Sequence, residues 1–188
     1  MRLGIIAEDD SDVAVVAEIT WRLLGRRNIG ISRFVGHGCG KLRRKCGAWA
    51  ANLVEQGCLF IVVVHDLDVH DEKQLHVSLT RAIAPARAKA SIVLLPKREL
   101  EAWLLYDAAA IASAFRQHRV AKVPGDPEQL SDPKKHLRRL IRATYGKEYL
   151  NTVHNIQIAK HLDVKQLKRS RSFCPHFGFA EAVKGMIG

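Results

Sequence analysis

Four apolar segments, each about as long as one β-strand, recur through the first half of the chain. They lie at 3–7, 29–35, 59–65 and 90–95. The stretches between them are long enough for helices, at about 11–26, 41–56 and 72–84. Such an alternation requires crossover connections, and it therefore predicts an α/β fold with a mainly parallel four-stranded sheet and helices on both faces.

The pattern becomes helical after the fourth apolar segment. Helices are expected over 98–115 and 133–144, with shorter ones near 151–161 and 176–186. Asp132 is a plausible N-cap for the second of these, and Pro133 suits a first helical turn. The turn-rich segment 123–127 predicts a boundary between an α/β core, 1–122, and a basic helical extension, 123–188, packed on that core.

Charge is distributed unevenly along the 188 residues, which carry a formal net charge of +11. Residues 116–188 hold 15 Lys and Arg against 6 Asp and Glu, whereas the acidic residues of the first part cluster at expected strand ends. An acidic pocket framed by a basic surface suits a polyanion held near bound cations.

Other compositional features argue against several protein classes. No apolar run approaches the roughly 20 residues needed to span a bilayer, and no signal-peptide pattern is present, so a cytoplasmic protein without a membrane partner is expected. The four cysteines are scattered and form no Cys-x-x-Cys pair, which argues against a disulfide framework and against structural zinc.

Carboxylates follow two of the expected strands. Asp66 and Asp68 end the 59–65 segment, and Glu8 ends the 3–7 segment. Side chains two residues apart on an extended chain project to the same side, and ligands of open α/β sheets gather at the carboxyl ends of strands. Oxygen ligands of this kind favour Mg²⁺, or Mn²⁺ in its place. The candidate metal ligands are Glu8, Asp12, Asp66, Asp68 and Asp71.

A structural role for part of this acidic group remains open. Asp9, Asp10 and Asp12 could simply favour the positive end of the helix that follows them.

A further candidate, Glu101, follows the fourth strand. On a helix over 98–115 it shares a face with Lys97 and Arg98, whereas Glu99 points away. A surface salt bridge from Glu101 to Lys97 or Arg98 is the alternative. The candidate catalytic residues are Glu8, Asp66, Asp68 and Glu101.

Two histidines flank the aspartates. His70 is the better candidate for proton transfer, because an imidazole near neutrality can exchange protons with bound water. His65, directly beside the strand end, is expected to be a hydrogen-bonded neighbour of the site.

Basic residues offer a nucleic-acid surface in two regions. The glycine-rich loop 36–41 opens a helix but is not a Walker A motif, which argues against ATP hydrolysis by this chain. The helix over 133–144 carries a basic stripe opposite its apolar residues. The alternative in both places is an ordinary solvated surface. The candidate nucleic-acid-binding residues are Lys41, Arg43, Arg44, Lys97, Lys134, Lys135, Arg138, Arg139 and Arg142.

The strand ending in Glu8, the Asp66-Leu67-Asp68 motif and the α/β layout between them resemble a TOPRIM domain, the metal-binding module of topoisomerases, primases and overcoming-lysogenization-defect nucleases. The resemblance implies Mg²⁺-dependent nuclease chemistry by Glu8, Asp66 and Asp68 and, by the same analogy, a role in phage defence. Asp9 stands where TOPRIM domains usually have glycine after the glutamate.

Four further motifs are similar to a bacterial TOPRIM-like family of unknown function that is often found beside ATPase genes. They are 40–42 (Gly-Lys-Leu), 99–105 (Glu-Leu-Glu-Ala-Trp-Leu-Leu), 132–135 (Asp-Pro-Lys-Lys) and 174–177 (Cys-Pro-His-Phe). This second resemblance extends over nearly the whole chain. It implies a TOPRIM-like fold and an ATPase as a possible protein partner.

The expected function is that of a Mg²⁺-dependent phosphodiesterase acting on DNA or RNA. Two rivals remain: a phosphoacceptor receiver domain using Asp9, Asp10 and Asp66, and a nucleic-acid or ATPase-partner binding module without turnover. A topoisomerase is not expected, because the chain is short and its tyrosines, Tyr149 among them, are interpreted as packing residues.

Overall fold

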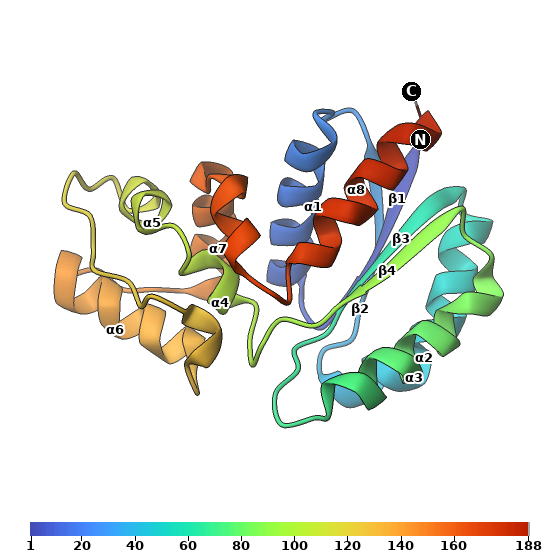
Figure 1. Cartoon of the computed structure of the whole chain (residues 1–188), viewed down its shortest axis with the longest axis horizontal. Coiled ribbons are helices and arrows are strands. Elements are labelled where there is room, and N and C mark those ends of the chain that lie inside the picture. The colour runs from blue at the N-terminus through green and yellow to red at the C-terminus, as the bar shows by residue number, and fades with distance from the viewer. Residues whose placement is uncertain (188) are drawn as a thin grey trace.

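The computed structural model describes residues 1–187 and consists of one parallel sheet with helices around it (Figure 1). The strands are β1 (Arg2–Ala7), β2 (Gly30–Val35), β3 (Cys58–Val64) and β4 (Ala90–Leu94). The α-helices are α1 (Asp10–Leu24), α2 (Cys39–Glu55), α3 (Glu72–Ile83), α4 (Glu101–Leu104), α5 (Ala108–Ala114), α6 (Pro133–Tyr145), α7 (Asn151–His161) and α8 (Cys174–Ile187). Three short 3₁₀ helices are η1 (Ala84–Ala86), η2 (Pro127–Gln129) and η3 (Val164–Arg169).

The strands lie in the order β2-β1-β3-β4, and every neighbouring pair is parallel. The α/β class, the four parallel strands and the helical C-terminal part expected from the sequence are confirmed. Strands β1 and β3 are central. The chain moves outward from β1 to β2 and, in the other direction, from β3 to β4, so the direction of winding changes between these two strands.

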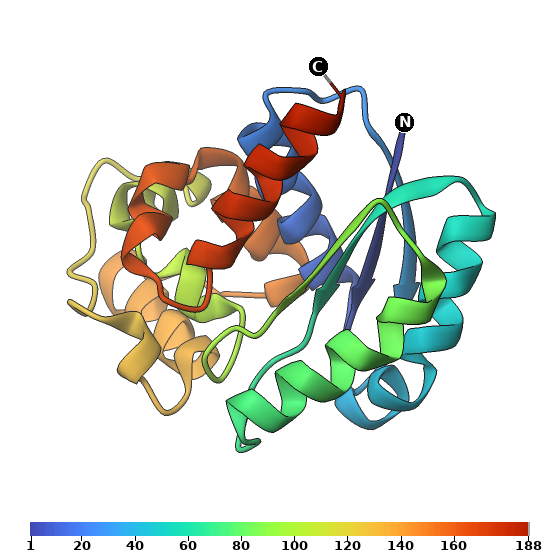
Figure 2. The same cartoon turned by 45° about the vertical axis from the view of Figure 1, so that its right-hand side comes forward.

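Helices cover both faces of the sheet (Figures 1 and 2). One face carries α2 and α3, which pack Leu42, Leu53 and Leu79 against the sheet. The other face carries α1 and α8, and the core there continues into α4–α7. Gly47 lets α2 approach α3 closely, since a Cβ at this position would lie 2.7 Å from the Ala82 carbonyl oxygen.

The expected helix over 98–115 is wrong in its continuity. The chain instead forms α4 and α5, separated by Leu105–Asp107. Arg98 has a left-handed backbone with φ of 67°, which keeps 97–100 out of a helix. Asp107 then begins α5 as an N-cap, because its side chain accepts a hydrogen bond from the Ala110 amide at 2.9 Å.

Within the C-terminal part, the buried carboxylate Glu128 holds the segment 170–172 in place. Glu128 accepts hydrogen bonds from the Ser170 hydroxyl at 2.7 Å and from the Arg171 and Ser172 amides at 3.0 and 3.1 Å. The sequence-based division at residue 122 falls in an irregular segment between α5 and η2. The division itself stays a prediction, and apolar residues from both sides of it share one core.

Candidate active site

The candidate site lies at the carboxyl ends of β1 and β3, where open α/β sheets form a crevice because the winding changes direction. Glu8 directly follows β1, and Asp66 is the second residue after β3. The pairing of the two strands therefore brings these carboxylates together from positions 58 residues apart. Their contact is direct, since the Asp66 amide donates to Glu8 Oε1 at 3.2 Å.

Glu8 is unusually basic for a carboxylate. Burial is the main cause, and the charges of Asp68 and Asp9 add to it, so that the pKa of Glu8 rises from 4.5 to about 7. Only 18% of its side chain is exposed. The site therefore holds a carboxyl group whose ionisation the fold opposes.

Asp66 shows the same effect more strongly. Its Oδ1 atom is buried and has no hydrogen-bond partner among the described residues. Burial, followed by the charges of Asp12 and Glu101, holds the pKa of Asp66 well above its usual range. A buried oxygen without a partner is costly for a protein, and it calls for a proton or a cation.

Asp12 joins the same electrostatic group. Burial, then the charges of Asp9 and Glu101, raise the pKa of Asp12 well above its usual range. Asp12 also accepts from the Asp9 amide at 3.3 Å, while Asp9 Oδ1 accepts from the Asp12 amide at 2.9 Å. These reciprocal bonds form the capping box of α1. Both roles suggested by the sequence, helix capping and membership of the acidic group, are therefore present together.

The structure thus gathers five of the carboxylates that the sequence analysis proposed as ligands or catalysts. They are Glu8, Asp12, Asp66, Asp68 and Glu101, and the charges of the other four all raise the pKa of Asp66. Asp71 has a different local role, because its side chain caps α3 by accepting from the Gln74 amide at 2.8 Å. We call the group of Glu8, Asp12, Asp66, Asp68 and Glu101 the acidic centre.

Glu101 is held in a buried polar network. Its Oε1 accepts from the Tyr149 hydroxyl and from Asn155 Nδ2, both at 3.1 Å. Tyr149 also contacts the Asn155 side-chain oxygen, and Asn155 Nδ2 donates to the Ser11 hydroxyl at 3.1 Å. The network joins α4 and α7 to the first turn of α1, and it fixes Glu101 on the α1 side of the crevice.

Tyr149 and Asn155 were not predicted from the sequence as hydrogen-bond partners of Glu101. Tyr149 is buried, as a packing residue would be, but its hydroxyl serves Glu101. Asn155 offered one signal that could have been used, since it occupies the face of α7 that also buries Ile158 and Ala159. A polar side chain on an apolar face has to find hydrogen-bond partners.

The sequence-based surroundings of Glu101 are corrected by the break before α4. Among the described residues Glu101 pairs with Lys134, at 3.7 Å between Nζ and Oε1, and not with Lys97 or Arg98. Lys97 lies 3.9 Å from Glu72 instead. Glu99, expected to point away, accepts from the Lys134 amide at 2.8 Å, so both glutamates meet at the start of α6.

Two cations stand out at the edge of the acidic centre. Burial alone would lower the pKa of Lys134, but nearby carboxylates, Glu101 foremost, raise it above its usual range. Arg43, near the start of α2, is close enough for its charge to lower the pKa of Glu8. The other proposed nucleic-acid contacts on α2 and α6 are exposed or half-buried; they are Lys41, Arg44, Lys135, Arg138, Arg139 and Arg142.

The histidines differ in environment. His65 is buried, its Nδ1 lies 2.6 Å from the Asp66 carbonyl oxygen and 3.2 Å from Glu8 Oε1, and burial lowers its pKa. A neutral ring with its proton on Nδ1 would serve both oxygens. His70 is only half-buried and lines a hollow of about 430 Å³ beside Asp68, Lys97 and Arg98.

The two loops that carry the outer part of the site are tied together. Arg98 Nη1 donates to the Asp68 carbonyl oxygen at 2.8 Å, and the Asp68 amide donates to the Arg98 carbonyl oxygen at 3.3 Å. Both residues have left-handed backbones, with φ of 46° for Asp68 and 67° for Arg98. The reciprocal bonds hold this uncommon backbone conformation and fix the position of Asp68.

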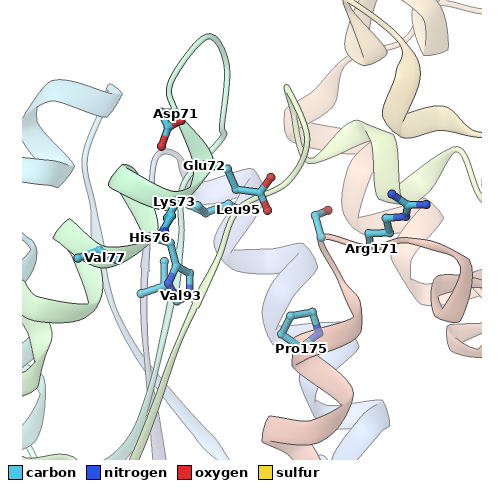
Figure 3. Close-up of a pocket in the computed structure, with 10 residues that line it drawn as sticks. Asp71, Glu72, Lys73, His76, Val77, Val93, Leu95, Arg171 and Pro175 are labelled. Carbon is cyan, nitrogen blue, oxygen red and sulfur yellow. The ribbon is translucent and has the colours of Figure 1, made fainter.

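A separate hollow of about 440 Å³ opens between α3 and the start of α8 (Figure 3). Figure 3 shows Glu72, Lys73 and His76 on the α3 side and Arg171 and Pro175 on the other. None of the five carboxylates of the acidic centre lines it. This hollow is therefore distinct from the candidate site.

The acidic centre fits a hard cation in its donor chemistry. Carboxylate oxygens are the ligands that Mg²⁺ prefers, and the partnerless Asp66 Oδ1 is an available donor. Within residues 1–187, no three His, Cys, Asp or Glu side chains stand in an arrangement already shaped to hold a metal ion. A cation would have to draw the side chains together, with Glu8, Asp66 and Asp68 as its first partners.

Comparison with protein families gives a match over most of the chain. The profile of the family described as "Domain of unknown function (DUF4276)" matches residues 11–179. Neither the curated proteins nor the solved structures include a significant match. Across the described residues, no helix is both long and apolar enough to cross a membrane. Since the profile covers most of the sequence, the chain belongs to the DUF4276 family.

Proposed function

We propose that this protein is a TOPRIM-like nuclease, a Mg²⁺-dependent phosphodiesterase that acts on DNA or RNA, with Mn²⁺ able to replace Mg²⁺. The observation that carries the proposal is the buried, partnerless Asp66 Oδ1 within a group of carboxylates at the switch point of the sheet. Clusters with such perturbed pKa values are more frequent at functional sites than elsewhere on protein surfaces.

The carboxylates of the acidic centre need a compensating positive charge to ionise together. Each added negative charge in the centre raises the cost of ionising the next, as the raised pKa values of Glu8, Asp12 and Asp66 express. A divalent cation bound by Glu8, Asp66 and Asp68 would remove that cost. When bound, Mg²⁺ would supply Lewis-acid polarisation of a phosphoryl oxygen and a lowered pKa for a coordinated water.

The cations around the centre would bind and orient the substrate. Lys134 and Arg43 approach it from α6 and α2, and a phosphodiester between them would meet positive charge from two elements. Tyr149 and Asn155 hold Glu101 in place beside Lys134. His70, half-buried next to Asp68, is the residue best placed to accept or return a proton at the open edge.

A receiver domain is less well supported. Asp9 is committed to the capping box, and Asp10 pairs with Arg33 at 2.9 Å. The four-stranded sheet is followed by helices and not by a fifth strand in the described chain.

The wider parts of the proposal rest on other grounds. An ATPase partner and a role in phage defence follow from the family resemblance, and a cytoplasmic location follows from composition. A binding module without turnover would keep the same cation site and the same basic surface. Turnover is what separates it from the nuclease.

The test is cleavage of labelled single- and double-stranded DNA and RNA with Mg²⁺ or Mn²⁺. Wild type would be compared with Asp66→Asn, Glu8→Gln and the matched control Asp10→Asn, whose carboxylate is exposed and outside the acidic centre. Cleavage by wild type and by the control, lost in the other two folded variants, supports the proposal. Absence of cleavage by wild type under every condition, including the presence of a neighbouring ATPase, refutes it.

A further inference from the structure

A hollow lined mainly by basic residues lies at the C-terminal end of α6, apart from the acidic centre. Arg138 and Arg142 of α6, with Gly146 and Lys147 after it, line a hollow of about 320 Å³. Tyr149 closes the hollow on one side, and Glu148 is the only carboxylate that lines it. We call it the basic hollow. Lys147, which contributes to it, was not among the candidates from the sequence.

The positive charge of the basic hollow is uncompensated. Within residues 1–187, neither Arg138, Arg142 nor Lys147 forms an ion pair, and Glu148 reaches none of them within pairing distance. Lys147 Nζ donates to the Phe115 carbonyl oxygen at 2.7 Å, on the side of a neighbouring hollow that Lys147 also lines, and this bond leaves its charge without an ion pair. Three neighbouring cations without ion pairs favour a ligand with phosphate groups.

Two connections link residues of the hollow to the acidic centre. Lys134, Arg138 and Arg142 are successive i, i+4 positions on α6, about 6 Å apart along the helix axis, so they form one stripe. The first of them contacts Glu101. Tyr149 is among the residues that line the hollow, and its hydroxyl donates to Glu101 Oε1.

We propose that the basic hollow binds backbone phosphates of the same nucleic-acid strand whose scissile phosphate lies at the acidic centre. The inference rests on the proposed function and deepens it, since it locates a second contact for the proposed substrate and requires a strand longer than one nucleotide. A strand several nucleotides long spans the stripe from Lys134 to Lys147. A mononucleotide or small phosphomonoester reaches only one end of it. The ligand chemistry is the phosphodiester backbone, which DNA and RNA share.

The experiment measures binding without cleavage. Anisotropy of short fluorescein-labelled single strands, one DNA and one RNA, would be recorded in EDTA over a range of salt concentrations. The variants are Arg138→Ala/Arg142→Ala and Lys147→Ala, and the control is Lys165→Ala, an exposed lysine of η3 away from the hollow. Far-UV circular dichroism checks that each variant is folded.

The double variant is expected to bind both strands about tenfold more weakly or worse, and its log–log salt slope should shrink by about 1.4, since each lost phosphate contact on a single strand removes about 0.7. Lys147→Ala should lower the slope by about 0.7. Binding by the double variant within twofold of Lys165→Ala, or no strand binding by wild type, overturns the inference.

The two proposals fail separately. A wild type that binds strands through the hollow and does not cleave them with Mg²⁺ or Mn²⁺, with or without a neighbouring ATPase, refutes the nuclease and keeps the binding site. A wild type that cleaves, together with a double variant whose strand affinity is unchanged, keeps the nuclease and refutes the hollow.

Discussion

Glu8→Gln should stabilise the metal-free protein above neutral pH, because it removes a carboxylate whose ionisation the fold opposes. Burial raises the pKa of Glu8 from 4.5 to about 7. At about 1.4 kcal/mol for each pKa unit, this corresponds to a cost of about 3 kcal/mol once Glu8 is ionised. The glutamine keeps an oxygen that can accept from the Asp66 amide, so the hydrogen bond at 3.2 Å is retained.

The pH dependence follows from the direction of the change. Between pH values of about 4.5 and 7, Glu8 is ionised in the unfolded chain and still protonated in the folded one. The folded state then binds more protons, so the free energy of unfolding of wild type falls as pH rises through this window. The advantage of Glu8→Gln should be absent below it and complete above it, where a gain of roughly 6–12 °C in Tm is expected.

The assay is urea unfolding followed by circular dichroism, in EDTA, across this pH window. Asp10→Asn serves as the control, since it removes one exposed carboxylate of the same helix end. Adding Mg²⁺ should then stabilise wild type according to its affinity and leave Glu8→Gln nearly unchanged, because a ligand has been lost. The reasoning is refuted if Glu8→Gln gains nothing above pH 7, or gains equally at all pH values.

Two further predictions concern the polar contacts that position the site. Tyr149→Phe removes the hydroxyl that is hydrogen-bonded to Glu101 and Asn155, and it should lower the free energy of unfolding by about 2 kcal/mol and reduce strand cleavage. Urea unfolding and a cleavage assay check this, and unchanged values would contradict the network. Glu128→Ala leaves the Ser170 hydroxyl and two amides of 171–172 without their acceptor, and should cost about 3 kcal/mol and raise amide hydrogen exchange around 170–173; exchange confined to other segments would show that Glu128 does not hold this segment in place.

The sheet and the heart of the site could be predicted because both depend on short-range patterns. Apolar strand segments fix the sheet, and parallel strands bring Glu8 and Asp66 to one edge whatever the connecting helices do. The contact of Tyr149 with Glu101 spans 48 residues and no local pattern encodes it. The break before α5 was partly readable, since Asp107 precedes three alanines and so resembles an N-cap.

The left-handed conformation of Arg98 was not readable in the same way. Arginine rarely adopts positive φ, and here the reciprocal bonds with Asp68 hold it there. A helix over 98–115 satisfied the local sequence, and a tertiary contact from the neighbouring loop prevented it. With the helix interrupted there, both Glu99 and Glu101 contact Lys134.

The C-terminal part completes the core and holds Glu101 of the acidic centre in place, so a chain ending at residue 122 should not fold cooperatively. Helix α7 packs on α1 and α5, and α8 packs on α1 and β4. Without them, the outer face of α1 and the Trp103 ring that meets Phe173 would be exposed.

Polar contacts of the α/β core also depend on the C-terminal part, because Ser11 and Glu101 would lose the hydrogen bonds that Asn155 donates to them. Urea unfolding of the fragment 1–122, alone and mixed with 123–188, tests this. A gradual transition for the fragment alone, made cooperative by its partner fragment, is the expected result. A sharp transition for 1–122 alone would mean that the α/β core is independent, and that the extension only covers a site already formed.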